Sequence, residues 1–183
     1  MNLSMKRMIL LVLALLTHRV GFAQYQPADE GSALKFTISN LGFDVKGTFS
    51  GLAGKINFDA QNPSAASFDV TLNAGSVNTD NSLRDEHLKA GGYFDVTNYP
   101  HIRLASTAIK STGKNRYEFT GKLTIKNTTK DISFPFTATT ETDGYLFTGS
   151  FKINRKDYGV GGTSTIANEL QVDMSIRAKK VSS

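Results

Sequence analysis

The stretch from Tyr117 to Phe136, YEFTGKLTIKNTTKDISFPF, contains the pattern from which the fold can be inferred. In its first half an apolar residue or a glycine occupies every second position, and the alternation returns after the polar pair Asn127-Thr128. A period of two places successive side chains on opposite faces, which is typical of a β-strand with one buried face. Two such runs joined by a short turn predict an antiparallel hairpin.

The same alternation occupies the chain from about residue 30 to 178. Further runs with one apolar phase are Leu34–Ile38, Phe43–Phe49, Leu52–Phe58, Phe68–Leu72, Ile102–Leu104, Tyr145–Ile153 and Leu170–Ile176. Eight or nine strands with short connections predict an all-β, antiparallel barrel or sandwich. Pro135 has no amide proton to donate to a sheet and is therefore expected at an edge or a bulge of its strand.

Four glycines share the inward, apolar phase of their strands: Gly47, Gly54, Gly121 and Gly149. One interpretation is that they permit the bends that a coiled, closed sheet requires. The other, which is compatible with the first, is that they withhold side chains along one lane and leave a tube inside the barrel.

One short helix is expected over about residues 81–90. The polar residues at 80–82 (Asp, Asn, Ser) can cap its start, and Asp85 lies in the first turn, where the helix dipole favours negative charge. Lys89 lies in the last turn, and Gly91 suits a left-handed stop. The helix has too few apolar residues for a core of its own, so it is expected to lie across one end of the strands.

The first 23 residues have the pattern of a secretory signal. Lys6 and Arg7 precede an apolar run from Met8 to Leu16, and Ala23 ends a short segment with small residues. Nine apolar residues are too few for a span, which needs about 20. We therefore expect cleavage after Ala23, one domain over residues 24–183, and a location in the periplasm or outside the cell.

Composition excludes several classes of function. Removal of the signal lowers the net charge from +5 to +2, and no basic stripe interleaved with aromatic residues argues for nucleic acid. The chain has no cysteine, and His87 and His101 are the histidines that remain after residue 23. No metal site and no cofactor are expected from these residues.

The cluster Asp85-Glu86-His87 raises the question of catalysis. Neighbouring residues on a helix point about 100° apart, so the two carboxylates do not converge on one point. The sequence contains no Gly-x-Ser-x-Gly nucleophile elbow. No catalytic residue is predicted, and a hydrolase acting through His87 is the alternative. A structural interpretation pairs Arg84 with a nearby acid and has Asp85 cap backbone amides.

An ordered series of short motifs resembles the YceI-like family. The motifs are Ser76-Val77-x-Thr79, Arg84-Asp85-x-His87-Leu88, Phe94-Asp95, Tyr99-Pro100-x-Ile102, Gly121-x-Leu123-Thr124-Ile125 and Asn154-Arg155-x-Asp157-Tyr158-Gly159. The resemblance implies an extended, lipocalin-like antiparallel barrel in an exported bacterial protein that binds amphipathic isoprenoid or fatty-chain ligands. Asn40 and Asn127 depart from the family pattern, which commonly has histidine and glycine there.

Strand phase predicts which side chains line the barrel. The expected lining is Phe36, Ile38, Phe43, Val45, Phe49, Phe119, Leu123, Phe134, Phe136, Phe147, Phe151 and Met174. Such a tube suits an isoprenoid, an isoprenoid quinone or a fatty-acid derivative, held for transport or storage. A carrier of this kind would contact membranes transiently. The alternative is a barrel filled by phenylalanine, whose outer surface binds a protein partner.

Polar residues near one end complete the predicted site. Asn40, Arg84, His87 and Lys89 are candidates to contact a ligand head group, with residues 90–98 as a gate. A structural role is expected for Asp85, Asn154, Arg155, Asp157 and Gly159. The sequence leaves the head group, the chain length, the lipid donor and acceptor, and the oligomeric state open.

Overall fold

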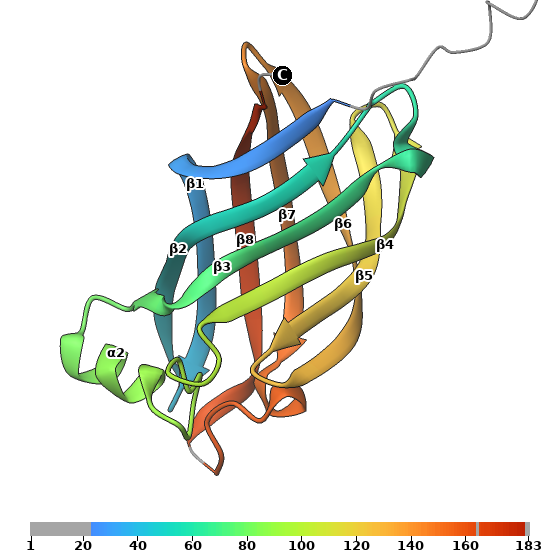
Figure 1. Cartoon of the computed structure of the whole chain (residues 1–183). Coiled ribbons are helices and arrows are strands. Elements are labelled where there is room, and N and C mark those ends of the chain that lie inside the picture. The colour runs from blue at the N-terminus through green and yellow to red at the C-terminus, as the bar shows by residue number, and fades with distance from the viewer. Residues whose placement is uncertain (1–22, 164, 182–183) are drawn as a thin grey trace, which may run out of the picture.

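Eight antiparallel strands close into a barrel in the computed structural model, which describes residues 23–163 and 165–181 (Figure 1). Each strand pairs with the next along the chain, and β8 pairs with β1. The strands are β1 (Gln24–Asn40), β2 (Phe43–Asn57), β3 (Ser67–Asn78), β4 (His101–Gly113), β5 (Arg116–Ile125), β6 (Thr128–Glu141), β7 (Gly144–Asn154) and β8 (Ile166–Lys180). The predicted fold class is confirmed. The expected signal segment lies outside the described residues, apart from Ala23.

Because the strands run up and down, their connections alternate between the two ends of the barrel. One end carries the β1–β2 turn, the helix α2 (Ser82–Lys89), the β5–β6 turn and the short helix η2 (Arg155–Tyr158). The other end carries the short helix η1 (Pro63–Ala65) and the β4–β5 and β6–β7 turns. The helix predicted over 81–90 is α2, which begins after the cap residue Asn81.

The hairpin from Tyr117 to Phe136 forms as expected. Tyr117 faces Phe136 across β5 and β6, and Phe119 faces Phe134. The strands are joined by Lys126 and Asn127, and Lys126 has a positive φ of 56°. Inward phenyl rings on adjacent strands stack, with 4.8 Å between the ring centroids of Phe119 and Phe134.

Pro135 marks a seam in the barrel wall. It pairs with Glu118 of β5, but the pairing of β6 with β7 begins only at Phe136 and continues to Glu141. Proline cannot donate to a ladder, so the β6–β7 ladder stops there. The edge position predicted for Pro135 is confirmed on the side that faces β7, although the barrel as a whole is closed. Across this seam, which we define as residues 128–135 of β6 beside residues 150–154 of β7, the rings of Phe134 and Phe151 stack at 4.4 Å.

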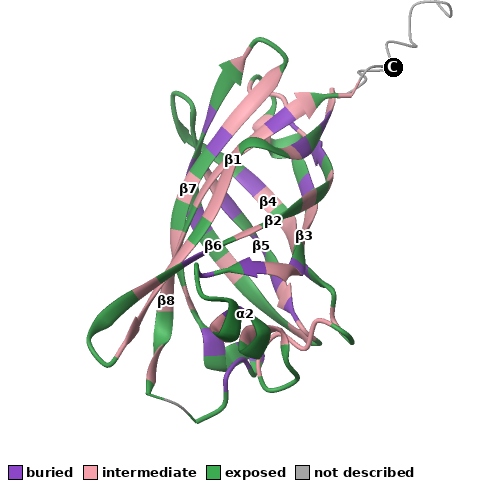
Figure 2. Cartoon of the chain, turned by 90° about the vertical axis from the view of Figure 1, so that its left-hand side faces the viewer, coloured by how far each residue is buried: buried purple, intermediate pink, exposed green. Residues whose placement is uncertain are grey.

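An aromatic cluster fills the end of the barrel opposite α2. Phe58 lies at its centre, 1% exposed, with four aromatic rings at centroid distances of 5.0–6.2 Å in edge-to-face geometry: Phe68, Tyr117, Tyr145 and Phe147. Burial is the main cause that raises the pKa of Tyr117 above its ordinary 10.0. In Figure 2 buried segments alternate with intermediate and exposed ones along the strands. This cluster gives the barrel a closed floor.

The inward glycines mark close contacts rather than a lane of empty space. A Cβ on Gly47 would lie 2.3 Å from Cζ of Phe36, and one on Gly54 would lie 2.2 Å from the carbonyl oxygen of Asp69. Gly121 and Gly149 also face neighbouring backbone and side chains. The interpretation as a tube made by missing side chains is therefore wrong at these positions. Gly54, with φ of 118°, fits the interpretation as a bend.

We predict that Gly54→Ala lowers the free energy of unfolding by about 3 kcal/mol, because the methyl group meets the Asp69 carbonyl and the backbone is strained for any other residue. Gly91→Ala is the control, since a Cβ there has no atom within 4 Å, and it should change stability by less than about 0.5 kcal/mol. Urea unfolding measures both. Equal stability of the two variants would contradict the close-contact interpretation.

Candidate functional site: an apolar cavity with a polar mouth

A cavity of about 500 Å³ lies inside the barrel. All eight strands contribute to its wall, and the inner faces of Phe68, Phe119, Phe136 and Phe147 connect it to the aromatic cluster. At the other end α2 and η2 contribute residues to the lining. The cavity is therefore a pocket with an aromatic floor and a mouth beside the helix α2.

Strand phase identified most of this wall. Eleven of the twelve predicted side chains line the cavity: Phe36, Ile38, Val45, Phe49, Phe119, Leu123, Phe134, Phe136, Phe147, Phe151 and Met174. The prediction omitted others in the same inward phase, among them Val70, Leu72, Leu104, Leu170 and Val172. The alternation of apolar and polar residues in β3, β4 and β8 would have identified these five as inward-facing. Direct contact with a ligand stays a prediction for the whole set.

Phe43 does not line the cavity, and its prediction is wrong. Its side chain is 78% exposed, and it pairs with Asn40 beside the turn Leu41-Gly42. Alternation indicates on which side of a strand a residue lies, but not where along the strand the enclosed interior ends. The β1–β2 hairpin continues past the mouth, so an inward-phase residue at its tip faces solvent.

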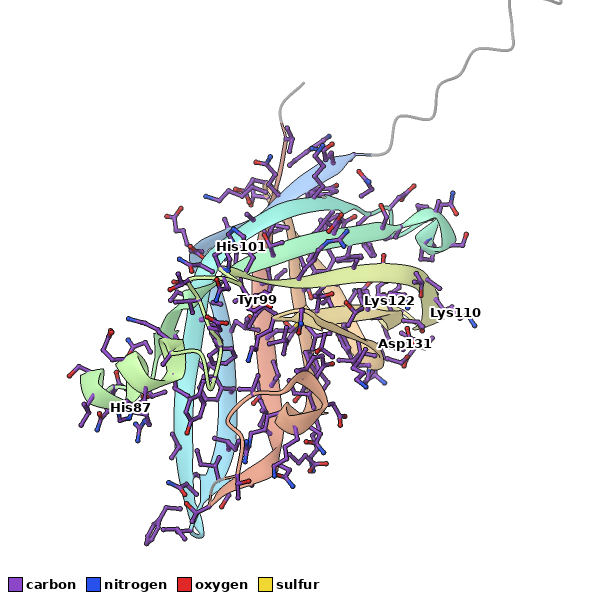
Figure 3. The ribbon with its side chains drawn as sticks, turned by 60° about the horizontal axis from the view of Figure 1, so that its bottom comes forward. His87, Tyr99, His101, Lys110, Lys122 and Asp131 are labelled. Carbon is purple, nitrogen blue, oxygen red and sulfur yellow. The ribbon has the colours of Figure 1, made fainter. Side chains whose placement is uncertain are left out.

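The mouth carries three of the four predicted head-group residues. Asn40, Arg84 and His87 line the cavity, whereas Nζ of Lys89 pairs with Glu86 at 2.8 Å and lies outside the lining. The amide oxygen of Asn40 accepts a hydrogen bond from Oγ1 of Thr165 at 3.0 Å. Figure 3 shows His87 on α2 at the side of the mouth. Polar groups thus gather at the open end of a largely apolar pocket.

Thr79 fastens α2 to the barrel. Nε of Arg84 donates to Oγ1 of Thr79 at 2.7 Å, and Nη2 donates to the Thr79 carbonyl at 2.7 Å. The carboxylate of Asp85 accepts from the amide and the hydroxyl of Thr79 at 2.9 and 2.6 Å. Asp85 thus caps a backbone amide, as expected. The expectation that Arg84 pairs with an acid is wrong. Arg84 and Asp85 both hydrogen-bond to Thr79 instead of to each other.

The segment from Asn154 to Gly159 forms a tight corner below β7. The side chain of Asn154 accepts from the amide of Lys156 at 3.0 Å, and Gly159 ends η2 in the left-handed conformation with φ of 66°. The exposed Asp157 lies in the first turn of η2. Asn154 and Gly159 thus shape this corner, and the structural role expected for Asp157 stays a prediction.

Arg155 ties the loop after this corner to the barrel. Its side chain is buried, and it donates to the carbonyls of Val160 at 2.7 Å, Gly161 at 2.8 Å, Ala167 at 2.9 Å and Ile166 at 3.0 Å. A planar guanidinium can reach carbonyls on two sides of a loop at once. Arg155 therefore closes one side of the mouth.

The sequence of the chain matches the model of the YceI-like domain over residues 25–178. The chain belongs to the YceI-like family. It is 35% identical to a UPF0312 protein of Pseudomonas savastanoi pv. phaseolicola over 147 residues, which cover 76% of this chain and 77% of the relative.

Solved structures show the same fold. The crystal structure of BcnA from Burkholderia cenocepacia superposes with a TM-score of 0.77 at 24% identity, covering 82% of this chain and 98% of BcnA. A polyisoprenoid-binding domain from Saccharophagus degradans, implicated in plant cell wall breakdown, superposes with a TM-score of 0.70 at 13% identity, covering 88% and 100%. At these identities the likeness concerns the fold alone.

In this YceI-like barrel the segment predicted as a gate is packed against the wall. Phe94 meets Phe49 edge-to-face at 5.4 Å, and the carbonyl of Gly92 accepts from the amide of Gly161 at 2.9 Å. The amide of Phe94 also donates to the carbonyl of Leu88. Opening of residues 90–98 stays a prediction, and these are the contacts that opening would break.

Residues 23–163 and 165–181 contain no group of three His, Asp or Glu side chains placed to hold a metal ion. Over the same residues, no helix has both the length and the apolar character needed to cross a membrane.

We predict that Arg155→Lys loosens the loop over residues 159–167 and lowers the free energy of unfolding by about 2–4 kcal/mol, since an ammonium group cannot span the four carbonyls. Amide hydrogen exchange should accelerate in that loop and not in β4 and β5. Lys156→Met, at the exposed neighbouring position, is the control and should leave exchange unchanged. Unchanged exchange in Arg155→Lys would contradict the assigned role.

Proposed function

We propose that this YceI-like protein binds a long-chain amphipathic lipid, with the apolar tail in the cavity and the polar head at the mouth. The observation that carries the proposal is the pocket itself: about 500 Å³, apolar over most of its wall and polar at one end. Cavities of about 300–1,000 Å³ are typical of sites for small ligands. The open interior argues against the alternative of a barrel filled by its own side chains.

The energetics favour the tail as the main source of affinity for a ligand taken from water. Burial gives ~0.8 kcal/mol per methylene, so a five-carbon unit contributes up to ~4 kcal/mol. A tail taken from a membrane moves between two apolar media, and its contribution nearly cancels. Loading and unloading are then close to balanced, as a carrier or a storage protein requires, and the head group sets the direction.

An isoprenoid, an isoprenoid quinone or a fatty-acid derivative has the shape that the pocket requires. The polyisoprenoid-binding domain of Saccharophagus degradans has the same fold, and this supports an isoprenoid as the first candidate. Arg84 uses Nε and Nη2 to hold Thr79, and in the described part of the chain its Nη1 makes no hydrogen bond. Nη1 of Arg84, His87 and Asn40 are the groups that we propose contact the head.

We further propose that the protein is exported. The proposal depends on the pattern of residues 1–23, a charged start, an apolar middle and small residues before Gln24. A periplasmic or secreted location also agrees with a lipid carrier that meets membranes from the outer side of the inner bilayer.

We predict that Val172→Trp raises the dissociation constant for fluorescent stearate and fluorescent farnesyl probes by about tenfold or more, because the indole occupies the wall of the cavity between Phe36 and Phe151. Lys110→Trp places the same side chain on the exposed outer face of β4 and should leave affinity unchanged (Figure 3). Fluorescence titration measures both variants. Equal affinity in two folded variants would remove the cavity as the binding site.

Catalysis through His87 has little structural support. In the described residues its imidazole makes no side-chain hydrogen bond, and hydrolysis through histidine requires a nucleophile or an orienting acid within reach. We infer a binding protein rather than an enzyme.

We therefore predict that the purified protein does not turn over ester or isoprenoid substrates. His87→Ala should weaken affinity for the stearate probe by about two- to fivefold, because His87 is one of three proposed head-group contacts while the tail supplies most of the affinity. Product analysis by mass spectrometry tests the first statement and titration tests the second. Turnover that His87→Ala abolishes, with binding intact, would establish the enzyme instead. Mass spectrometry of native protein from its host would reveal a copurifying lipid.

A further inference from the structure

Three large apolar side chains at the mouth are open to solvent. Leu41 and Phe43, on the turn between β1 and β2, are 73% and 78% exposed, and Leu83 on α2 is 70% exposed. Leu83 also lines the opening of the cavity, as does Asn40 next to Leu41. Figure 1 shows α2 and the β1–β2 turn at the same end of the barrel. Single exposed apolar residues are ordinary, but here they gather around one opening.

Leucine is unfavourable for the stability of the fold at turn position 41. Its φ is 52° and that of Gly42 is 84°, so this two-residue turn needs the left-handed conformation that asparagine and glycine adopt readily. The β4–β5 turn at the opposite end has asparagine, Asn115, at its positive φ of 58°. Leucine at such a position adds strain and exposes apolar surface, so the fold does not explain it. A strained, exposed residue beside a binding site points to function.

Charge on the hairpin tip is balanced. Asp44 and Lys46 follow Phe43, one acid and one base, and both are exposed. The tip therefore has no net charge to select an anionic or a cationic partner. What it offers is apolar side chains on a protruding turn, which suits insertion into the interface of a bilayer.

We propose that the mouth docks on a lipid bilayer through Leu41, Phe43 and Leu83. Docking places the opening of the cavity against the apolar layer, so that a lipid tail passes between bilayer and pocket without crossing water. The cost of exposing a tail to water grows with each methylene, so this route lowers the barrier to exchange. The inference rests on the proposed lipid binding and adds its partner surface.

The test compares vesicle binding and lipid transfer in the variant Leu41→Asn/Phe43→Ser, neither residue of which lines the cavity. Asparagine suits the left-handed turn, so thermal stability should not fall. The chain is expressed with residues 1–23, so that any processing occurs as in the cell. We expect binding to neutral phosphatidylcholine vesicles and the rate of stearate-probe transfer from them to fall by about tenfold or more. Affinity for the same probe delivered from cyclodextrin should be unchanged.

The variant Lys114→Leu/Arg116→Phe is a matched control. It places leucine and phenylalanine at the equivalent positions of the β4–β5 turn, at the end of the barrel closed by the aromatic cluster. It should strengthen vesicle binding without accelerating transfer, because the mouth then faces away from the bilayer. Faster transfer in this control would mean that the position of the mouth is irrelevant and would overturn the proposal.

The outcomes separate the two proposals. Unchanged transfer in Leu41→Asn/Phe43→Ser, with the stearate probe still bound from cyclodextrin, overturns docking and leaves lipid binding standing. Failure of the unaltered protein to bind stearate and farnesyl probes from cyclodextrin refutes the proposed function. If the apolar tip instead joins two copies of the chain, sedimentation velocity will show a dimer that the variant dissociates, and vesicles will not bind; this also overturns docking.

Discussion

Closure of the sheet by pairing of β8 with β1 is the constraint on which the rest of the molecule depends. The first and last strands pair in register from Leu34 with Met174 to Ile38 with Leu170. An open sheet of alternating strands would expose one apolar face, whereas a closed one turns all of these faces toward a common axis. Edges disappear at the same time, so no strand is left to pair with another molecule along its full length. The chain has no cysteine, and this closure stabilises the fold without disulfides.

The interior is filled to different degrees at its two ends, and this difference creates the site. Phe58, which follows directly after β2, packs its ring against Tyr117, Tyr145 and Phe147. Toward α2 the wall residues surround a space of about 500 Å³. At the open end, Thr79 and Arg155 hold α2 and the loop after η2 by hydrogen bonds.

Much of this could be predicted from the sequence, because alternation determines which side of a strand faces inward. It identified the Phe119–Phe134 pair and eleven lining residues, and local rules placed Pro135 and α2. It could not predict how far each hairpin extends, which is why Phe43 was misplaced. Nor could it show what fills the space beside a glycine: Phe36 covers Gly47, and this depends on side-chain packing between strands. The partner of Arg84 is likewise a neutral threonine, because geometry at the end of β3 brings Thr79 closer than any acid.

The seam between β6 and β7 has a mechanical consequence. Between residues 128–135 and 150–154 the wall is held by contacts of side chains such as Phe134 and Phe151, since the paired register of the two strands ends at Phe136 and Gly149. Side-chain contacts adjust over tenths of an ångström at little energy, whereas hydrogen bonds in a ladder do not. The wall of the barrel is thus more compliant along this seam than where the strands are paired in register. Such a barrel can accommodate slender and branched ligands in the same cavity, because its circumference can widen along the β6–β7 seam.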